Sequence, residues 1–508
     1  MAAAAHQHVE EQHFDIHEDL RTEDTEMMAE EERTEEAQPM DEDERVQLLQ
    51  HQQQQHHHMQ QMHPHQQQQQ QPPHRQAQPQ PQDEPQEEEE EDAADESSEE
   101  EAVDRGVQAD MDKLQSDFPG FRNRYRLIKR IGEGTFSTVY KAEDIMYDHY
   151  DNSWDYEEDS SKWTPPPKEG DSPVARPRRK ARYVAIKKIY VTSSPSRILN
   201  ELELLHDLRQ CPSVCPLITA FRETDQVVAI LPYFRHGDFR TYFRDLTISE
   251  ISVYLRELFT ALKSVHDHKI LHRDIKPTNF LYDPGTQRGV LVDFGLAERE
   301  GSDAKPCLCH ESRDVRKHRQ TNSTWAQNAA NPQVGYPKSD TRSSRRANRA
   351  GTRGFRAPEV LFKCTEQTTS IDIWSAGVIL LTILSKRFPF FNSADDVEAM
   401  IEIATIFGTK RMKAAGLLHG CVFETSIPTV GQGGFSMEKI IMWSTCRGED
   451  KPLTQDEKMA IGFLEWCIEL DPNRRITAAE ALEHEFLQLG ELEGEETTYN
   501  EEPMAAEY

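Results

Sequence analysis

The distribution of apolar residues along this chain of 508 residues is the feature that most limits its fold. From residue 1 to about residue 117 the sequence is acidic, then rich in Gln and His, then in Pro and Gln, and finally in Glu, with almost no periodic apolar residues. A segment of this composition cannot bury enough apolar surface to offset the entropy lost on ordering. We therefore expect residues 1–117 to form a disordered extension and the acidic residues 490–508 to form a tail of the same kind.

The charge balance of the chain limits its partners. Lys and Arg number 58 and Asp and Glu number 90, so the formal net charge is −32, which disfavours sequence-independent binding to nucleic acid or to anionic membranes. The first residues lack the basic start and apolar core of a signal peptide, and the longest apolar run, near Val378 to Leu384, is too short to span a bilayer. The 8 cysteines are thinly spread, which suits free thiols in a reducing compartment. We expect a soluble intracellular protein with no direct nucleic-acid or membrane partner.

Strand-like patterns begin near Tyr125, where two β-branched and apolar runs are joined by a turn containing glycines, as in a β-hairpin. Residues 146–182 interrupt this pattern before another β-branched run from Tyr183 to Val191, so we interpret 146–182 as a loop inserted between neighbouring strands. Ser194-Pro195 provides an N-cap and a first-turn proline for a helix, and a further buried strand is expected from Gln226 to Phe234. These pieces predict a small lobe built on a sheet.

Beyond Gly237 the spacing of apolar residues becomes helical. One predicted helix carries its apolar residues on a single face: Ile251, Leu255, Leu258, Phe259, Leu262 and Val265. Similar stripes recur near Ile371 to Leu384 and near Ala460 to Leu470. The predicted fold class is therefore α+β, with a small β-rich lobe, a larger α-helical lobe and a cleft between them, folded from about residue 125 to residue 487.

The turn of the first hairpin reads Gly132-Glu133-Gly134-Thr135-Phe136-Ser137-Thr138-Val139. Small residues there would let backbone N–H groups approach phosphates, although a tight structural hairpin accounts for two glycines equally well. On a later strand, Val184-Ala185-Ile186-Lys187 ends in a lysine that could reach the α- and β-phosphates of a nucleotide. Glu201, on the helix that follows Ser194, is the favoured partner for Lys187, and Glu203 is the alternative.

The strongest chemical signal is His272-Arg273-Asp274-Ile275-Lys276-Pro277-Thr278-Asn279, followed by Asp293-Phe294-Gly295. Phosphoryl transfer needs one carboxylate that orients a hydroxyl nucleophile and accepts its proton, and oxygen ligands that hold Mg²⁺ against the phosphates. Asp274 fits the first role, and Asn279 and Asp293 fit the second. Lys276 would neutralise the phosphoryl group during transfer.

Taken together, these motifs resemble the protein kinase family from about Tyr125 to Leu487, and Gly351 to Glu359 and Asp372 to Gly377 extend the likeness. The resemblance implies ATP and Mg²⁺ as cofactors, catalytic roles for Asp274 and Lys276, and an architectural pair between Glu359 and Arg475. The lysine at position 276 is similar to that of serine/threonine kinases. The implied nucleotide contacts come from the turn, the strands and the lobe connection: Ile131, Gly132, Gly134, Ser137, Val139, Ala185, Lys187, Glu201, Pro232 and Tyr233.

Within that family, three features resemble the origin-firing kinases of the cell-division-cycle-seven type, particularly the fungal members. They are YVAIKKIYVTSSPSRILNELELL from Tyr183, VVAILPYF before the lobe connection, and a long insertion between Asp293-Phe294-Gly295 and Ala357-Pro358-Glu359. This resemblance implies a regulatory activating subunit, the replicative minichromosome maintenance helicase as a substrate, and a nuclear role in starting DNA replication. Two alternatives stay open: a cyclin-dependent-type kinase, and a pseudokinase scaffold that has lost phosphoryl transfer.

The insertion, residues 300–348, lacks secondary-structure signals and is long enough to be either a functional loop or a disordered excursion. Within it, Cys307 and Cys309 resemble the zinc-binding part of that family's insert. A closed structural zinc site needs four ligands, and His310 and His318 are the two imidazoles that could complete it. Two exposed loop cysteines are the alternative interpretation.

Two basic clusters stand out in this acidic chain. The first precedes and enters the segment that starts at Gly351, and its members are Arg342, Arg345, Arg346, Arg349 and Arg353. It would favour substrates with acid or phosphate beside the target Ser or Thr, although a basic run is often simply solvated. The second cluster, between residues 176 and 182, could serve as a nuclear localisation signal.

Overall fold

The computed structural model describes residues 104–134, 136–150, 152, 182–190, 192–301, 306–322, 349–448 and 450–489. The expectations for residues 1–103 and for the tail 490–508 therefore lie outside the described residues. The same is true of residues 151 and 153–181, which are most of the inserted loop 146–182 and of its basic cluster. Among the described helices, none combines the length and apolar character needed to cross a membrane.

The small lobe is built on one antiparallel sheet of five strands in the order β1-β2-β3-β5-β4. Its strands are β1 (Tyr125–Glu133), β2 (Ser137–Asp144), β3 (Tyr183–Ile189), β4 (Thr219–Glu223) and β5 (Gln226–Pro232). The predicted hairpin is confirmed, with Gly132 of β1 paired to Val139 of β2. Helix α4 (Pro195–Asp207) is also confirmed, and the Ser194 side chain accepts a hydrogen bond from the backbone N–H of Arg197 at its start.

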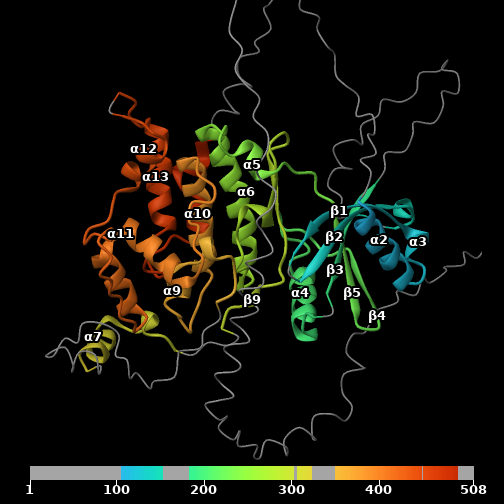
Figure 1. Cartoon of the computed structure of the whole chain (residues 1–508), viewed down its shortest axis with the longest axis horizontal. Coiled ribbons are helices and arrows are strands. Elements are labelled where there is room, and N and C mark those ends of the chain that lie inside the picture. Colours follow the sequence, from blue (N-terminus) through green and yellow to red (C-terminus); the bar gives the residue numbers. More distant parts are fainter. Residues whose placement is uncertain are drawn as a thin grey trace, which may run out of the picture. The chain divides into compact units, whose positions relative to one another are not determined.

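The ordered part of the small lobe begins earlier than predicted. Helix α2 (Arg105–Asp117) starts at Asp104, whose side chain caps it, and is followed by the short helix α3 (Phe121–Arg124). Both helices contact β1 (Figure 1), and the α2 residues Met111 and Leu114 are buried in the apolar cluster on that side of the sheet. The predicted boundary at residue 117 is therefore wrong for residues 104–117, because a few apolar residues at helical spacing suffice to dock a polar helix.

The contribution of α2 to folding can be tested by shortening a buried side chain. We expect Leu114→Ala to lower the free energy of unfolding by about 2–5 kcal/mol, because Leu114 has 0% exposure and truncation leaves a cavity. Equilibrium denaturation of the full chain, followed by tryptophan fluorescence, measures the loss. The exposed neighbour Lys113 provides the control, and Lys113→Ala should change stability by less than about 0.5 kcal/mol. Equal effects of the two substitutions would mean that α2 does not pack on the sheet.

The large lobe is mostly helical, as predicted. Its helices are α5 (Phe239–Tyr242), α6 (Ile248–Asp267), α9 (Pro358–Leu361), α10 (Ser370–Ser385), α11 (Asp396–Leu418), α12 (Met437–Ser444), α13 (Gln455–Cys467) and α14 (Ala478–Leu482). The three predicted apolar stripes lie on α6, α10 and α13, and all three helices contribute to one large core. Helix α10 is buried along nearly its whole length and contacts both α6 and α13 (Figure 1).

Two short strand pairs lie where the chain passes from α6 toward α9. Strand β6 (Ile270–Leu271) pairs with β9 (Glu298–Arg299), and β7 (Phe280–Asp283) pairs with β8 (Arg288–Leu291). A parallel bridge between Val214 and Leu291 connects the small lobe to this region. The segments that carry Asp274 and Asp293 are thereby fixed between strands.

The insertion at residues 300–348 contains secondary structure that the sequence does not indicate. Residues Leu308–His310 form a 3₁₀ turn and Arg313–Thr321 form helix α7, so the expectation of no secondary structure is wrong there. Helix α7 has no apolar stripe, and its Arg, Lys and Gln residues are intrinsically good helix formers. A search for apolar periodicity therefore cannot find it.

Candidate active site

The predicted pairing of Lys187 with Glu201 is confirmed. The Lys187 Nζ donates to Glu201 Oε1 at 2.5 Å and to Asp293 Oδ1 at 2.8 Å. Lys187 and Glu201 are both buried, whereas the alternative partner Glu203 is exposed. One ammonium group thus joins β3, α4 and the segment that begins with Asp293.

Lys187 and the carboxylates of Glu201 and Asp293 stabilise one another's charged forms. Burial on its own lowers the pKa of Lys187, but the carboxylates of Glu201 and Asp293 outweigh burial and raise that pKa. Burial likewise raises the pKa of Asp293, but the Lys187 ammonium outweighs it and brings the pKa to about 2. Lys187 is therefore a cation and Asp293 an anion at neutral pH, as binding to phosphates and to a divalent cation requires.

Helix α4 is also held against the segment that follows Asp293. The Asn200 side-chain amide donates to the carbonyl oxygen of Ala297 at 2.9 Å, and Arg299 forms an ion pair with Asp207. Phe294 has 0% exposure and packs edge-on against His272, with 4.8 Å between ring centroids. These contacts hold α4, which carries Glu201, close to the segment that begins with Asp293.

Asp274 is the centre of a hydrogen-bonded group. Its Oδ2 accepts from Lys276 Nζ at 2.7 Å and from Asn279 Nδ2 at 3.1 Å, and its Oδ1 accepts from the Thr352 amide at 2.9 Å and hydroxyl at 2.7 Å. Burial raises the pKa of Asp274, but Lys276 and Thr352 together lower it below its usual value. The carboxylate is therefore ionised at neutral pH, the form that can accept a proton.

The loop that carries Asp274 is anchored by a buried carboxylate of α10. Asp372 has 0% exposure and accepts hydrogen bonds from the backbone amides of His272 and Arg273, both at 2.8 Å. Arg273 also forms an ion pair with Glu298 of β9 at 3.1 Å and donates to Gln367 at 3.0 Å. The backbone immediately before the candidate catalytic carboxylate is thus held from the core.

Gly351 lies near the end of the activation segment, the stretch of chain from Asp293 to Glu359, and allows it to approach this loop. Its φ is +97°, and a Cβ atom at this position would lie 2.2 Å from the carbonyl oxygen of Arg273. Because any other residue would clash with that carbonyl, glycine is required for Thr352 to reach Asp274.

The candidate cation ligands belong to neighbouring segments, because the backbone amide of Val292, which precedes Asp293, donates to the Asn279 carbonyl at 2.9 Å. Asp293 faces Lys187, and Asn279 donates its amide N–H to the carbonyl oxygen of Asp274 at 2.9 Å, which directs its amide oxygen elsewhere. Side-chain oxygens of this kind fit Mg²⁺, which prefers oxygen ligands and shares them with phosphates. The residues present therefore suit the cofactors of a kinase.

The predicted nucleotide contacts come from neighbouring strands of the sheet. Val139 pairs with Lys187, Ala185 pairs with Leu231, and Val184 pairs with Pro232. At the hairpin tip, the Gly134 amide donates to the Ser137 carbonyl at 2.9 Å, and Ile131 is exposed. Tyr233 packs edge-on against Tyr183. The sheet thus brings together the predicted residues of β1, β2, β3 and β5 by strand pairing.

The predicted ion pair between Glu359 and Arg475 is confirmed. Arg475 donates to the two carboxylate oxygens at 2.7 and 3.0 Å, and it also donates to the carbonyl oxygens of Ser370 and Glu469. Both charged residues are buried, with exposures of 1% and 4%. The pair connects the end of the activation segment to the helical core.

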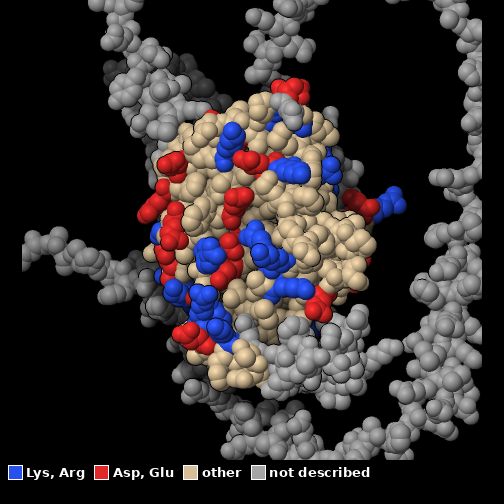
Figure 2. Space-filling model, turned by 90° about the vertical axis from the view of Figure 1, so that its left-hand side faces the viewer, with Lys and Arg blue, Asp and Glu red and all other residues tan. Residues whose placement is uncertain are grey.

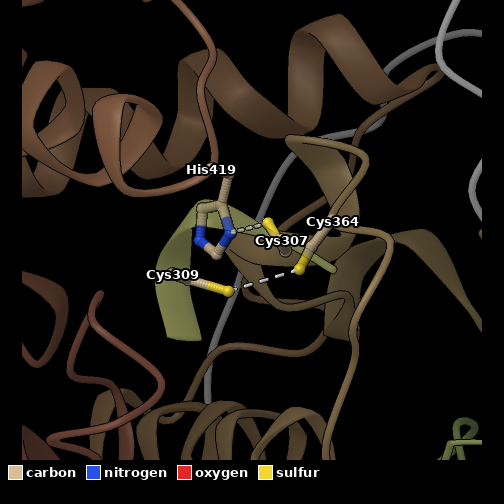
Figure 3. A group of neighbouring side chains, drawn as sticks. All are labelled: Cys307, Cys309, Cys364 and His419. Carbon is tan, nitrogen blue, oxygen red and sulfur yellow. Dashed lines mark hydrogen bonds between the residues drawn. The ribbon is translucent and has the colours of Figure 1, made fainter. Parts of the chain in front are cut away.

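Four buried residues form a cluster that could hold a metal ion: Cys307, Cys309, Cys364 and His419. Their ligand atoms lie within 4.8 Å of one another, and the three sulfur atoms and the imidazole point toward a common centre (Figure 3). Cys309 Sγ is 3.7 Å from Cys364 Sγ, and Cys307 Sγ is 3.8 Å from His419 Nδ1. Tetrahedral zinc with Zn–S bonds of about 2.3 Å separates its ligand atoms by about 3.8 Å.

The sequence-based choice of histidines for this site is wrong. His310 is exposed and lies against the carbonyl oxygen of Glu366, and His318 lies within 3.1 Å of the Asn322 side chain in α7. The actual neighbours of Cys307 and Cys309 are Cys364, which follows α9, and His419, which ends α11. No local spacing relates these residues, and the only sequence signal was the small number of cysteines.

The three thiols of this cluster titrate together. Hydrogen bonds from Cys309 and Cys364 lower the pKa of Cys307, whereas the neighbouring Cys307 raises the pKa of Cys309 to about 12 and also raises that of Cys364. One thiolate is therefore favoured and further negative charge is opposed. A divalent cation would remove that opposition, because it stabilises all the thiolates at once.

Arginines of the first basic cluster line a pocket of about 430 Å³ between the activation segment and α11. Its lining residues are Arg349, Arg353, Arg356, Asp395, Asp396 and Val397. Asp396 pairs with Arg349 at 2.7 Å and with Arg356 at 2.6 Å, and Asp395 caps α11. Arg353 donates to the carbonyl oxygen of Ala394, which carries no charge. The other predicted members, Arg342, Arg345 and Arg346, lie outside the described residues.

Basic side chains do not dominate the face of the molecule shown in Figure 2. On the face shown in Figure 2, the Lys and Arg side chains are intermingled with Asp and Glu. Because Asp395 and Asp396 also line the arginine pocket, the pocket suits one or two acidic groups and is not a broad basic surface of the kind that follows a nucleic-acid backbone.

Comparison with known proteins agrees with this geometry. The protein kinase domain family matches residues 170–322 and 334–487. The match begins after β2, so it does not include the glycine-containing hairpin. The likeness of that hairpin to the glycine-rich loop of kinases rests on its sequence motif and on the pairing of β1 with β2.

Similarity to individual proteins is more specific. The chain is 49% identical to the cell cycle serine/threonine-protein kinase hsk1 of Schizosaccharomyces pombe, over 75% of this chain and 76% of that protein. It is 41% identical to the cell cycle protein kinase spo4 of the same organism, over 76% and 90%. It is 28% identical to the human cell division cycle 7-related protein kinase, over 62% and 71%. The chain therefore belongs to the protein kinase family and, within it, to the serine/threonine kinases related to cell division cycle 7.

Proposed function

We propose that this kinase transfers the γ-phosphate of ATP to Ser or Thr residues of acidic substrates, and that its principal substrate is the replicative minichromosome maintenance helicase. In this proposal it acts in the nucleus, with a regulatory activating subunit, to start DNA replication. The central observation is the group formed by Asp274, Lys276 and Thr352, in which an ionised carboxylate lies beside the arginine pocket. The relatives named for the cell cycle and cell division support the cellular role.

The proposed roles of the site residues follow from their contacts. Bound ATP and Mg²⁺ supply the phosphoryl group and part of the charge neutralisation. Lys187, held by Glu201, would bind the α- and β-phosphates, and Asn279 and Asp293 would hold the cation. Asp274 would orient the acceptor hydroxyl and take its proton, while Lys276 would stabilise the charge of the transferring group.

The predicted preference for acidic substrates rests on the arginine pocket. Thr352 touches Asp274, and Arg353 is the next residue in the chain. A substrate hydroxyl placed at Asp274 would therefore lie near Arg353. Since Arg353 contacts a neutral carbonyl, its charge remains available to a carboxylate or phosphate.

This preference can be measured with two peptides that differ only in the residue after the target serine, Glu in one and Ala in the other. We expect Arg353→Gln to lower kcat/KM for the Glu peptide about tenfold and to change it little for the Ala peptide, because one charge-assisted contact is lost. Arg411→Gln is the control, since Arg411 lies on α11 and pairs with Glu469 outside the pocket. An equal loss on both peptides would argue against recognition of the acidic residue.

The helicase and subunit assignments require a direct assay. Transfer of labelled phosphate to the acidic N-terminal tail of the helicase should depend on the replication regulatory subunit. Stimulation by a cyclin instead would favour the cyclin-dependent alternative. Full activity without any added subunit would contradict the proposed regulation.

We also propose that Cys307, Cys309, Cys364 and His419 bind a structural zinc ion that fixes the insertion to the large lobe. The Cys307 amide donates to Glu366, and the Cys309 carbonyl accepts from Arg316 and Asn473. The backbone around the cluster is therefore hydrogen-bonded both to the large lobe and to α7 of the insertion. A closed set of three thiolates and one imidazole is typical of structural zinc.

Zinc binding is tested by metal analysis of the purified chain. We expect about one zinc per chain in the wild type and less than about a tenth of that in Cys364→Ser, because a structural site needs all four ligands. Cys446→Ser, which changes an exposed cysteine, should keep its zinc. A wild-type protein prepared without chelators and free of zinc would contradict the proposal.

A further inference from the structure

A lysine of the small lobe lies against two aromatic rings. The Nζ atom of Lys141, on β2, is 4.0 Å from the ring centroid of Tyr183 on β3 and 4.3 Å from that of Tyr233. The two rings pack edge-on, with 6.1 Å between their centroids. An ammonium group this close to an aromatic face is attracted by the electrons of the ring. Lys141, Tyr183 and Tyr233 therefore form one cation–π group, which we call the Lys141 clamp.

Strand pairing places the Lys141 clamp on the same face of the sheet as the proposed nucleotide contacts. Lys141 pairs directly with Ala185, and Val139 pairs with Lys187. Directly opposed residues of antiparallel strands share a face, and so do residues two positions apart on one strand. Lys141 thus lies in the row of Ala185, about 7 Å along the strand from the row of Lys187, and Tyr183 lies one row farther.

The opposite face of this part of the sheet is filled by protein. The two neighbours of Lys141 on β2, Tyr140 and Ala142, are buried in the apolar cluster that includes residues of α2. Lys141 itself is half-buried, and Tyr183 is 38% exposed. The Lys141 clamp therefore borders the face that is left open for a ligand, beyond the row that contains Ala185.

The Lys141 clamp also holds the start of the connection between the lobes. Tyr233 directly follows β5, whose last residue, Pro232, pairs with Val184 of β3. Farther along the connection, the Gly237 amide donates to the carbonyl oxygen of Tyr282 on β7 at 3.0 Å. One end of the connection is therefore attached to the sheet through Tyr233, and the other end is attached to the large lobe.

We propose that Lys141 is a positioning residue for the base of the nucleotide. By holding Tyr233 against the sheet, it keeps the lobe connection in the conformation that receives the base. The inference rests on the proposed binding of ATP by Lys187 and its neighbours. Without the Lys141 clamp, the connection must be ordered when the nucleotide binds, so the cost falls on nucleotide affinity and not on the phosphoryl-transfer step.

Nucleotide affinity and turnover test this role separately on the full chain. We expect Lys141→Met to raise the Kd for MgATP about fivefold in isothermal titration calorimetry, because Met keeps the length of Lys but not its charge. With ATP at saturation, kcat for the peptide with Glu after its target serine (the Ser-Glu peptide) should stay within about twofold of the wild type. A fall in kcat with an unchanged Kd would overturn the inference.

Two further lysine variants test whether the cation is the cause. Lys141→Arg should keep the Kd within about twofold of the wild type, because a guanidinium group also stacks on aromatic faces. Lys188→Met is the matched control. Lys188 lies on β3, and its place in the alternation assigns it to the opposite face from Lys187. An equal loss of affinity in Lys141→Arg and Lys141→Met would contradict a cation–π contact.

Adenosine separates the base from the phosphates. Because adenosine has no phosphate, its Kd should rise in Lys141→Met by about the same factor as that of MgATP. Lys187→Met should show the reverse pattern, with weaker MgATP binding and little change for adenosine. A loss of MgATP affinity in Lys141→Met without a matching loss for adenosine would mean that Lys141 acts on the phosphates through its charge, and it would overturn the proposal.

A double-variant cycle tests the link to Tyr233. Tyr233→Phe keeps the ring and should resemble the wild type, whereas Tyr233→Leu should weaken MgATP binding. Adding Lys141→Met to Tyr233→Leu should raise the Kd by no more than about twofold, because both changes break the same contact. Effects that simply multiply would contradict the Lys141 clamp.

The outcomes separate this inference from the proposed function. If the wild type binds MgATP and Lys141→Met binds it equally well, only the inference fails. If the wild type binds neither MgATP nor adenosine, the proposed function fails as well.

Discussion

Replacing Asp274 with Asn is expected to lower kcat for phosphate transfer by roughly 10²–10⁴-fold, the range that general-base catalysis contributes. The amide cannot accept the hydroxyl proton, although it can preserve part of the hydrogen bonding with Lys276 and Thr352. Transfer of labelled phosphate to the Ser-Glu peptide, in the presence of the regulatory subunit, measures the effect. Nucleotide binding by the variant should remain within about threefold of the wild type, because Asp274 is not among the proposed nucleotide contacts.

The control for this experiment is Asp267→Asn. Asp267 is an exposed residue at the end of α6 that pairs with Lys263 one turn earlier, so kcat should stay close to that of the wild type. Full activity in Asp274→Asn would require a different proton acceptor. If wild type and variant were equally inert even with the subunit, the pseudokinase scaffold would become the better description.

Breaking the buried pair between Glu359 and Arg475 should cause the largest loss of stability. We expect Arg475→Met to lower the free energy of unfolding by about 3–5 kcal/mol, because the substitution leaves the Glu359 carboxylate buried without its partner. Urea denaturation measures the change. Arg474→Met is the matched control, since Arg474 is adjacent but exposed, and its effect should be within about 0.5 kcal/mol.

A double variant isolates the cause of that loss. In Glu359→Leu/Arg475→Met both charges are gone, so part of the stability lost in Arg475→Met should return. If the double variant were as unstable as the sum of the two single variants, the loss would come from packing and from the Arg475 contacts with Ser370 and Glu469.

Several parts of the fold were predictable because their signals are local. The helix that follows Ser194 has an N-cap and a first-turn proline, the hairpin has glycines between two strand patterns, and α6 has an uninterrupted apolar stripe. Helices α2 and α7 were missed for the same reason, because the first has few apolar residues and the second has none on a continuous face. Packing on the sheet stabilises α2, whereas α7 consists largely of residues with high intrinsic helix propensity.

The same distinction applies to the site. Asp274 and Asn279 lie five residues apart, so their association follows from the sequence motif, and the pairing of Lys187 with Glu201 follows from a strand and a helix whose inward faces could be identified. The sequence by itself therefore determined the family, the fold class and the residues proposed for phosphoryl transfer.

Only the tertiary structure decided which residues meet across the large lobe. Cys309 is 55 positions from Cys364, and Cys307 is 112 positions from His419, so the cluster has no spacing that could be read along the chain. The arginine pocket is similar, because Asp396, which neutralises Arg349 and Arg356, comes from α11, a separate element. Local patterns report the face that an element buries, whereas the packing of whole elements determines which side chains share a site.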